Sequence, residues 1–259
     1  MKIEAVKLYE NGFMTQSFAF GGEEGVDKFD PTIKYRSSLQ NYVIDTGDEI
    51  ILVDTGMPKE TPEIPRNDEA PLYVGEKITD YVTALENLGY KKEDVSKILI
   101  THKHDDHTGE IRSFPDAKVY ISKTEAEEMK LEGDNIVPVE FTSGSYHNFE
   151  KSEKIVDGIY LIEATGHTTG NSIVIVEDDD KYVMIHGDVT YTDEALYANK
   201  LSVVFEDVDK ARETLDNVRE FISENPTVYL STHTPLGPEN LENQAIIDLD
   251  NEPESIKPE

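Results

Sequence analysis

The sequence predicts an α/β fold of four layers, in which two β-sheets pack against each other and helices cover their outer faces. Two observations lead to this fold class. Strand patterns and helix patterns alternate along the chain, and each half reads as strands, then a helix, then a strand. The helical segments carry apolar residues on one face only, which is typical of helices that cover a sheet.

The first half opens with sheet. Residues 3–9 alternate as a strand, and residues 41–54 read as two strands joined by a turn at Gly47. Residues 57–73 contain four prolines and are expected to form a loop that covers a site, acts as a lid or reaches a neighbouring chain. Residues 76–88 have apolar side chains at helical spacing before Gly89, which predicts a surface helix.

The later elements follow the same reasoning. A short apolar strand, residues 98–100, runs straight into a polar cluster. Further strands are expected at residues 119–122, 159–163, 172–176, 182–185 and 227–230. Helices are expected at residues 123–131 and 207–224, and the acidic tail, residues 248–259, is expected to fray.

Composition limits the classes of partner. The formal charge of −30, from 54 acidic and 24 basic side chains, opposes binding to nucleic acid or to an anionic membrane, so a small-molecule substrate is expected. Cysteine is absent, so a metal site must use nitrogen and oxygen ligands. No apolar run has the length of a membrane span or a signal segment, which predicts a cytoplasmic protein.

The polar cluster after residue 100 is the strongest chemical signal in the chain. His102, His104, Asp106 and His107 place four metal-ligand side chains within six residues, and three of the chain's seven histidines fall here. A polar surface loop is the competing interpretation, but chance seldom produces so dense a set of ligands. The cluster therefore predicts a metal site.

Three further candidates also follow strands or lie in turns. His167 lies between two glycines in a turn, and Asp188 and His233 each follow a predicted strand. A single aspartate or histidine after a strand is more often a cap or turn residue. The recurrence of the arrangement is what favours a shared site for all three.

At these residues the sequence resembles the metallo-β-lactamase superfamily. The HxHxDH motif of that family is found at residues 102–107, and it is followed by His167, Asp188 and His233. Residues 53–56 also look like the family's early strand-end motif, so the resemblance covers nearly the whole chain. It implies an αβ/βα four-layer sandwich and one metallo-hydrolase domain over residues 1–259. The length alone fits one large domain or two small ones.

The resemblance also implies roles for the ligands. His102, His104 and His167 would bind one metal ion, and Asp106, His107 and His233 the other. Asp188 would bridge the two ions, and Asp54 would steady the HxHxDH loop. Zinc is the expected metal, although His and carboxylate sites also accept iron, manganese or cobalt. Two such ions can share a hydroxide that attacks a carbonyl, and Asp106 can carry its proton to the leaving oxygen.

Within the superfamily, the chain most resembles the N-acyl homoserine lactonases. The similarity lies in residues 51–58, in residues 165–171 and in the spacing of Asp188 and Tyr191. It implies that Tyr191 hydrogen-bonds the substrate carbonyl or its oxyanion, whereas a packed aromatic residue is the competing interpretation. Residues 11–40 show no close match to the lactonases, and the chain has no tryptophan to line an acyl groove.

The expected activity is therefore opening of a lactone similar to an N-acyl homoserine lactone, which would make the protein a quorum-quenching enzyme. A glyoxalase II-like thioesterase or a phosphodiesterase is the alternative, disfavoured by the lack of a basic cluster and by the negative charge. A binding-only module is weak because all seven ligand positions are filled. The oligomeric state stays open, with a homodimer as one alternative. His147 is expected to be exposed and His186 to support Asp188 by a hydrogen bond.

Overall fold

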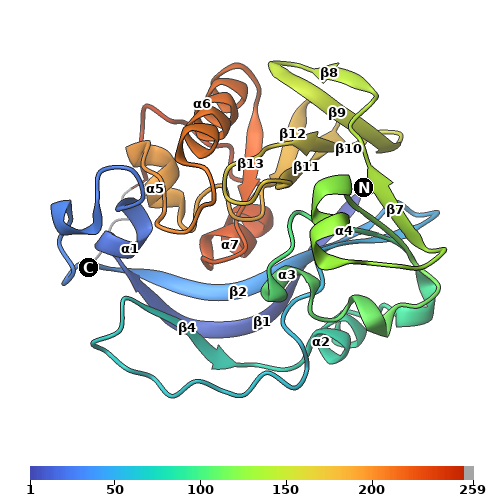
Figure 1. Cartoon of the computed structure of the whole chain (residues 1–259), viewed down its shortest axis with the longest axis horizontal. Coiled ribbons are helices and arrows are strands. Elements are labelled where there is room, and N and C mark those ends of the chain that lie inside the picture. Colours follow the sequence, from blue (N-terminus) through green and yellow to red (C-terminus); the bar gives the residue numbers. More distant parts are fainter. Residues whose placement is uncertain (254–259) are drawn as a thin grey trace.

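A computed structural model describes residues 1–253 and shows two mixed β-sheets that face each other (Figure 1). The first sheet has the strand order β4-β1-β2-β3-β5-β6-β7 and the second has the order β13-β12-β11-β10-β9-β8. The first sheet consists of β1 (Lys2–Thr15), β2 (Lys34–Asp45), β3 (Ile50–Val53), β4 (Leu72–Lys77), β5 (Val95–Leu99), β6 (Lys118–Ser122) and β7 (Ile136–Val139). The second consists of β8 (Gly144–Tyr146), β9 (Phe149–Val156), β10 (Ile159–Glu163), β11 (Ser172–Asp178), β12 (Lys181–Ile185) and β13 (Thr227–Leu230).

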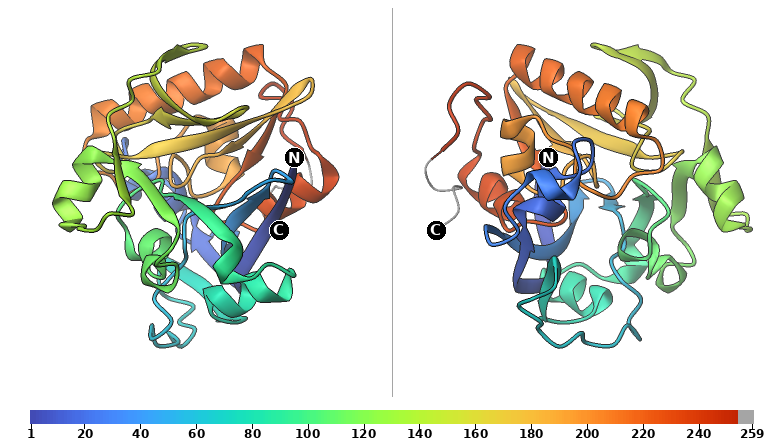
Figure 2. Two further views of the ribbon diagram at one scale, coloured as in Figure 1. Left: turned by 90° about the vertical axis from the view of Figure 1, so that its right-hand side faces the viewer. Right: turned by 60° about the vertical axis from the view of Figure 1, so that its left-hand side comes forward.

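Helices lie on the outer faces of this pair of sheets and at its open end. The long helix α6 crosses the outer face of the second sheet (Figure 2). The α-helices are α1 (Gln16–Phe20), α2 (Tyr81–Asn87), α3 (Asp105–Thr108), α4 (Lys123–Met129), α5 (Asp193–Ala198), α6 (Val208–Glu224) and α7 (Leu236–Asn243). Three short 3-10 turns lie at Val26–Lys28, Lys92–Asp94 and Ile111–Ser113.

Strand β11 shows how the layers are held together. Its side chains alternate, so that Ile173 and Ile175 pack with Leu215 of α6, whereas Val174 and Val176 join the core between the two sheets. A strand with a core on each face needs an almost continuous apolar sequence, and these four residues are fully buried. The predicted four-layer α/β sandwich is confirmed.

Most predicted elements are confirmed, although β1 and β2 are longer than predicted and the helix expected at residues 76–88 is shorter. Residues 76–88 were expected to be helical, but Lys77 pairs with Tyr9 as the end of β4, and the helix begins only at Tyr81. The Asp80 side chain accepts a hydrogen bond from the Thr83 amide and so caps the helix at this point. Strand pairing outweighs the helical pattern here, and it leaves Ile78 45% exposed.

The chain between β3 and β4 is the predicted proline-rich loop, shortened at its end because Leu72 and Tyr73 belong to β4. It runs beside β4 along the edge of the first sheet (Figure 1). Within residues 1–253, no helix combines the length and the apolar character needed to cross a bilayer. Residues 254–259 of the acidic tail lie outside the described residues, so the fraying of that tail stays a prediction.

Two buried carboxyl groups make the stability of this fold depend on pH. Burial raises the pKa of Asp193 to about 7 and that of Glu194 to about 8, at the start of α5. Asn240 of α7 donates a hydrogen bond to Asp193, and Arg36, a cation whose charge acts on both carboxyl groups, is paired with Glu239. Tyr35 and Tyr42 of β2 also interact with these carboxyl groups, but a tyrosine side chain adds no positive charge. The folded protein therefore holds protons that the unfolded chain releases near pH 4.

We expect the contribution of Asp193 and Glu194 to the free energy of unfolding to fall as the pH rises from about 4.5 to about 8, because these two groups release protons on unfolding in this window. Glu194→Gln removes one of these groups, so the free energy of unfolding should depend less steeply on pH. At pH 8.5 the variant should be more stable than wild type by an amount on the order of 1–3 kcal/mol. Urea unfolding of metal-loaded protein at pH 6 and pH 8.5 measures the effect. Glu86→Gln, an exposed change on α2, is the control, and parallel pH curves for wild type and Glu194→Gln would contradict the prediction.

Candidate metal centre

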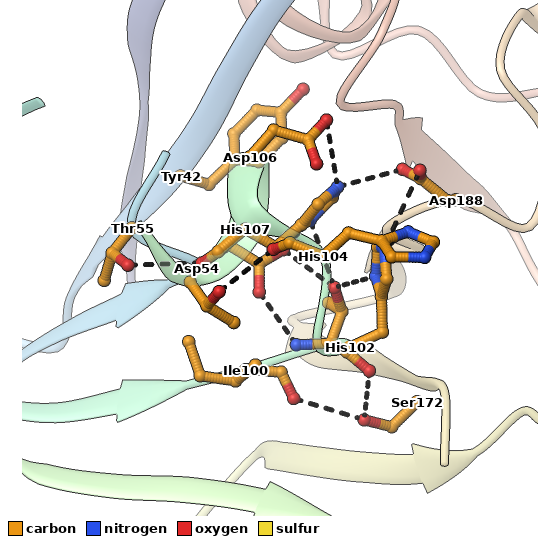
Figure 3. Close-up of polar contacts among 12 residues, drawn as sticks. Tyr42, Asp54, Thr55, Ile100, His102, His104, Asp106, His107, Ser172 and Asp188 are labelled. Carbon is orange, nitrogen blue, oxygen red and sulfur yellow. Dashed lines mark hydrogen bonds and ion pairs between the residues drawn. The ribbon is translucent and has the colours of Figure 1, made fainter. Parts of the chain in front are cut away.

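Asp54 holds the loop that follows β5. Its backbone, with φ of +63°, turns sharply at the end of β3 and directs the carboxylate toward that loop. The carboxylate accepts hydrogen bonds from the amide and the hydroxyl of Thr101, both at 2.8 Å, and contacts Nδ1 of His107 at 2.7 Å (Figure 3). Asp54 therefore fixes the orientation of the His107 ring, as expected from the sequence, and leaves Nε2 as its free nitrogen.

Three imidazoles converge to form what we call the first ligand group. His102 Nε2 lies 3.0 Å from His104 Nδ1, and His167 Nε2 lies 3.2 Å and 3.0 Å from these two atoms. His167 Nδ1 donates to the Val204 carbonyl at 2.7 Å. Burial lowers the pKa of His167 to about 4, so the ring is neutral and its Nε2 carries a lone pair.

Asp106, His107 and His233 form the second ligand group, whose ligand atoms lie within 4.8 Å of one another. Asp106 lies in the first turn of α3, and its Oδ2 is 3.4 Å from His233 Nε2 and 3.9 Å from His107 Nε2. Its side chain is 20% exposed, in contrast to the fully buried His107. The second group is thus the more open of the two.

Asp188 lies between the two groups. Its Oδ2 is 3.3 Å from His167 Nε2, and its Oδ1 is 3.2 Å from both His107 Nε2 and His233 Nε2. Burial alone would raise the pKa of Asp188, but the His233 and His107 imidazoles hold it well below its ordinary value. The carboxylate therefore carries a negative charge between two sets of nitrogen ligands.

The polar atoms at this centre are arranged to coordinate metal ions and not to hydrogen-bond to one another. Burial and the neighbouring imidazoles hold the pKa of His102 well below its ordinary value, so its ring and that of His167 direct lone pairs at the same space. Among the described residues, His107 Nε2 and Asp188 Oδ1 are buried without a hydrogen-bond partner. Such groups are costly unless a cation lies between them, so the donor set fits two metal ions.

The backbone brings these segments into contact. Gly187, with φ of +57°, turns the chain just before Asp188, and a Cβ there would lie 2.8 Å from the Thr101 hydroxyl oxygen. Strand β2 holds the other side, because the Ser38 amide donates to the His233 carbonyl at 3.2 Å. The Gln40 side chain donates to backbone carbonyls that flank His233. The backbone next to Asp188 is therefore held against the loop after β5, and the backbone around His233 is held against β2.

Tyr191 lies beside both ligand groups. Its ring centroid is 5.1 Å from that of His233 and 6.0 Å from that of His167, and it stacks on Phe18 at 5.5 Å. Burial raises the pKa of Tyr191 well above its ordinary value, so the hydroxyl keeps its proton and can donate it in a hydrogen bond. Phe18 was missed by the sequence analysis, because α1 carries no motif.

The remaining two histidines lie outside the centre. His147 is exposed, as predicted. His186 was expected to hydrogen-bond in support of Asp188, and this is wrong: neither of its ring nitrogens has a partner among the described residues. Its ring instead stacks on Tyr229, with centroids 3.8 Å apart and planes at 10°. His186 therefore packs against Tyr229 in the buried interior.

All seven sequence-predicted ligands thus meet at one end of the two sheets. They are His102, His104, Asp106, His107, His167, Asp188 and His233. The sequence analysis missed Glu125, which is fully buried on α4 and accepts hydrogen bonds from the Thr168 hydroxyl at 2.5 Å and from the Gly170 amide at 2.9 Å. This carboxylate supports the turn that carries His167. The separation of 43 residues between Glu125 and Thr168 along the chain hid the contact.

Comparison with known proteins identifies relatives that share this arrangement of elements. The family model of the metallo-beta-lactamase superfamily matches residues 40–233. An N-acyl homoserine lactonase of Bacillus cereus is 26% identical over 196 residues, which cover 73% of this chain and 78% of the relative. A probable metallo-hydrolase of Mycobacterium tuberculosis is 26% identical over 174 residues, covering 58% and 56% of the two chains.

Solved structures show the same fold. An N-acyl homoserine lactone hydrolase with N-hexanoyl-L-homoserine at its catalytic metal centre superposes with a TM-score of 0.67 at 20% identity, covering 95% of this chain and 100% of that one. AidC, a dizinc quorum-quenching lactonase, gives a TM-score of 0.66 at 16% identity, with coverage of 90% and 86%.

Proposed function

The chain belongs to the metallo-beta-lactamase superfamily and is a metal-dependent hydrolase, and from this premise we propose that it opens a neutral lactone ring at a centre of two divalent metal ions. One observation carries the proposal. The Asp188 carboxylate lies between two groups of ligands, 3.3 Å from His167 of the first group and 3.2 Å from His107 and His233 of the second, and Tyr191 lies beside both groups. N-acyl homoserine lactones are the substrates suggested by the lactonase relatives, and their opening would make the protein a quorum-quenching enzyme.

The donor set assigns the ions as follows. His102, His104 and His167 would hold one ion, Asp106, His107 and His233 the other, and Asp188 both. When bound, two such ions lower the pKa of a water molecule toward neutrality and polarise a substrate carbonyl. Zinc is the expected metal, since nitrogen and carboxylate ligands suit it, and iron, manganese and cobalt suit the same ligands.

The chain's own side chains handle the proton and the developing charge. Asp106, partly exposed on α3, takes the proton that the attacking water gives up as its oxygen bonds to the lactone carbonyl carbon. When the bond between this carbon and the ring oxygen breaks, Asp106 returns the proton to that oxygen, so that a hydroxy acid leaves. The Tyr191 hydroxyl donates a hydrogen bond to the carbonyl oxygen while its negative charge develops.

We expect Tyr191→Phe to lower kcat for lactone opening by about 100-fold, because removing one donor to a developing oxyanion typically has an effect of this size. The KM should change little, and both metal ions should stay bound. Steady-state kinetics on metal-loaded protein measure this. Tyr182→Phe, at the opposite end of β12, is the control. Equal kcat values for Tyr191→Phe and wild type would assign Tyr191 to packing alone.

A thioesterase of the glyoxalase II type or a phosphodiesterase is the second candidate. Both act on anionic substrates, which favour basic side chains at the site. The cation inside the HxHxDH motif, Lys103, is already paired with Glu128 and Glu206, and the chain as a whole carries −30 charges. A neutral ring suits these surroundings better than an anion does.

A substrate panel tests the proposal. Metal-loaded protein is offered N-acyl homoserine lactones of several chain lengths, a simple lactone, a glutathione thioester and a phosphodiester, and the hydrolysis of each is followed by proton release. We expect at least one lactone to be the best substrate by kcat/KM. Two bound metal ions with every lactone left intact would overturn the lactonase proposal, and the hydrolase assignment would then pass to whichever class is turned over.

A further inference from the structure

Lys103 lies between two candidate ligands in the sequence, yet its side chain points to other partners. Its ammonium group contacts one carboxylate oxygen of Glu128 on α4, and one of Glu206 at 2.6 Å. Thr169 binds the remaining oxygens, with its hydroxyl donating to Glu128 at 3.0 Å and its amide donating to Glu206 at 2.8 Å. These four residues form a closed set of hydrogen bonds, which we call the Lys103 network.

The Lys103 network joins both sides of the first ligand group. Lys103 lies in the loop that carries His102 and His104, whereas Thr169 follows His167 by two residues. The Glu206 amide also donates to the carbonyls of Gly166 and His167, at 2.9 Å and 3.0 Å. The network therefore fixes the position of the His167 turn relative to the HxHxDH loop. The second ligand group makes none of these contacts within residues 1–253.

Charge makes Lys103 the critical member. Glu128 and Glu206 lie close enough to repel each other, and Lys103 is the cation that both of them contact. Its side chain is 20% exposed, against 42% for Glu128 and 37% for Glu206, so water screens the ammonium group less than it screens the two carboxylates. Without the ammonium group, two carboxylates would face each other across the His167 turn and push it away from the loop.

We propose that Lys103 is a positioning residue that sets the affinity and the geometry of the first metal site, by holding His167 against His102 and His104. The inference rests on the proposed two-metal function. It goes beyond that function because it assigns a selective role to a side chain that binds neither metal nor substrate. Loss of such outer contacts typically weakens metal binding by 10-fold to 100-fold.

The test measures metal binding at each site separately. Zinc affinity is determined by competition with a chromophoric chelator, in a His233→Ala background for the first site and in a His167→Ala background for the second. Cobalt absorption spectra report the ligand geometry in parallel. We expect Lys103→Met to weaken zinc at the first site by about 10-fold to 100-fold and to shift its cobalt bands. The second site should keep its affinity, and Lys103→Arg should restore the first.

Two further variants keep the test decisive. Lys123 lies on α4, the helix that also carries Glu128, and Lys123→Met breaks only its exposed ion pair with Glu140, which follows β7. This variant should leave both sites unchanged. Thr169→Val removes only the hydroxyl bond to Glu128, and it should weaken the first site by a smaller factor. If Lys103→Met does not fold, the result for Thr169→Val decides. Equal weakening of both sites, or no change at the first, would overturn the inference.

The outcomes also separate this inference from the proposed function. A wild-type chain that binds two zinc ions but opens no lactone contradicts the lactonase proposal alone. A wild-type chain that opens lactones, together with a Lys103→Met variant of unchanged zinc affinity and cobalt spectrum, contradicts the role of Lys103 alone.

Discussion

Asp188→Ala is expected to lower kcat/KM for the best substrate by at least about 1000-fold, equivalent to about 4 kcal/mol of transition-state stabilisation. Among residues 1–253, the Asp188 carboxylate is the group placed between both sets of ligands, 3.2 Å from His107 and His233 and 3.3 Å from His167. Its loss removes the negative charge that offsets repulsion between two cations. Elemental analysis of the variant should therefore find fewer metal ions per chain than in wild type.

The control for this substitution is Asp180→Ala, because Asp180 is an exposed aspartate in the turn just before β12, the strand that leads to Asp188. It should keep wild-type activity and metal content. Circular dichroism must show that Asp188→Ala is folded, since a buried charge is being removed. A folded Asp188→Ala protein with two metal ions and more than a tenth of the wild-type kcat/KM would contradict a bridging role for this carboxylate.

Removal of metal is expected to abolish hydrolysis and to lower the unfolding temperature. Ligands that bind only the folded state stabilise it by RT ln(1 + [L]/Kd), or about 4 kcal/mol when free metal is 1000 times its Kd. The buried lone pairs of His102 and His167 and the partnerless His107 Nε2 are the groups that lose their cation. Dialysis against a chelator, followed by calorimetry and activity assays, measures both effects.

Readdition of zinc should restore activity and unfolding temperature together, with a stoichiometry near two ions per chain. Cobalt and manganese are the informative replacements, because they fit the same ligands and change the rate without changing the fold. A chelator-treated protein that keeps both its activity and its unfolding temperature, with less than one metal ion per chain, would contradict the metal centre as a whole.

The sequence predicts the layers well because their signals are local. Strands such as β10 and β13 are short apolar runs bounded by turn residues, and their observed bounds match the prediction. The extent of α2 was not predictable, because residues 76–77 are held in β4 by pairing with β1, more than 60 residues away in sequence. A helical pattern cannot reveal a distant strand partner.

The site divides in the same way. His102 to His107 are dense enough to be recognised alone, and the other three ligands share a place beside turns and strand ends. The contacts that orient these ligands cannot be predicted from the local sequence. Lys103 meets Glu206 at a separation of 103 residues, and Phe18 meets Tyr191 from a segment without any motif. Such pairs depend on how two sheets dock, which composition and periodicity do not encode.

The ligands come from both sheets, and this division has a consequence for how the chain folds. Each ligand group draws members from the loop after β5 in the first sheet and from turns of the second, such as those that carry His167 and His233. Neither sheet alone carries a complete set, so metal is captured only after the two have docked. We therefore expect bound metal to act as a cross-link between the halves that slows unfolding and leaves the rate of folding unchanged.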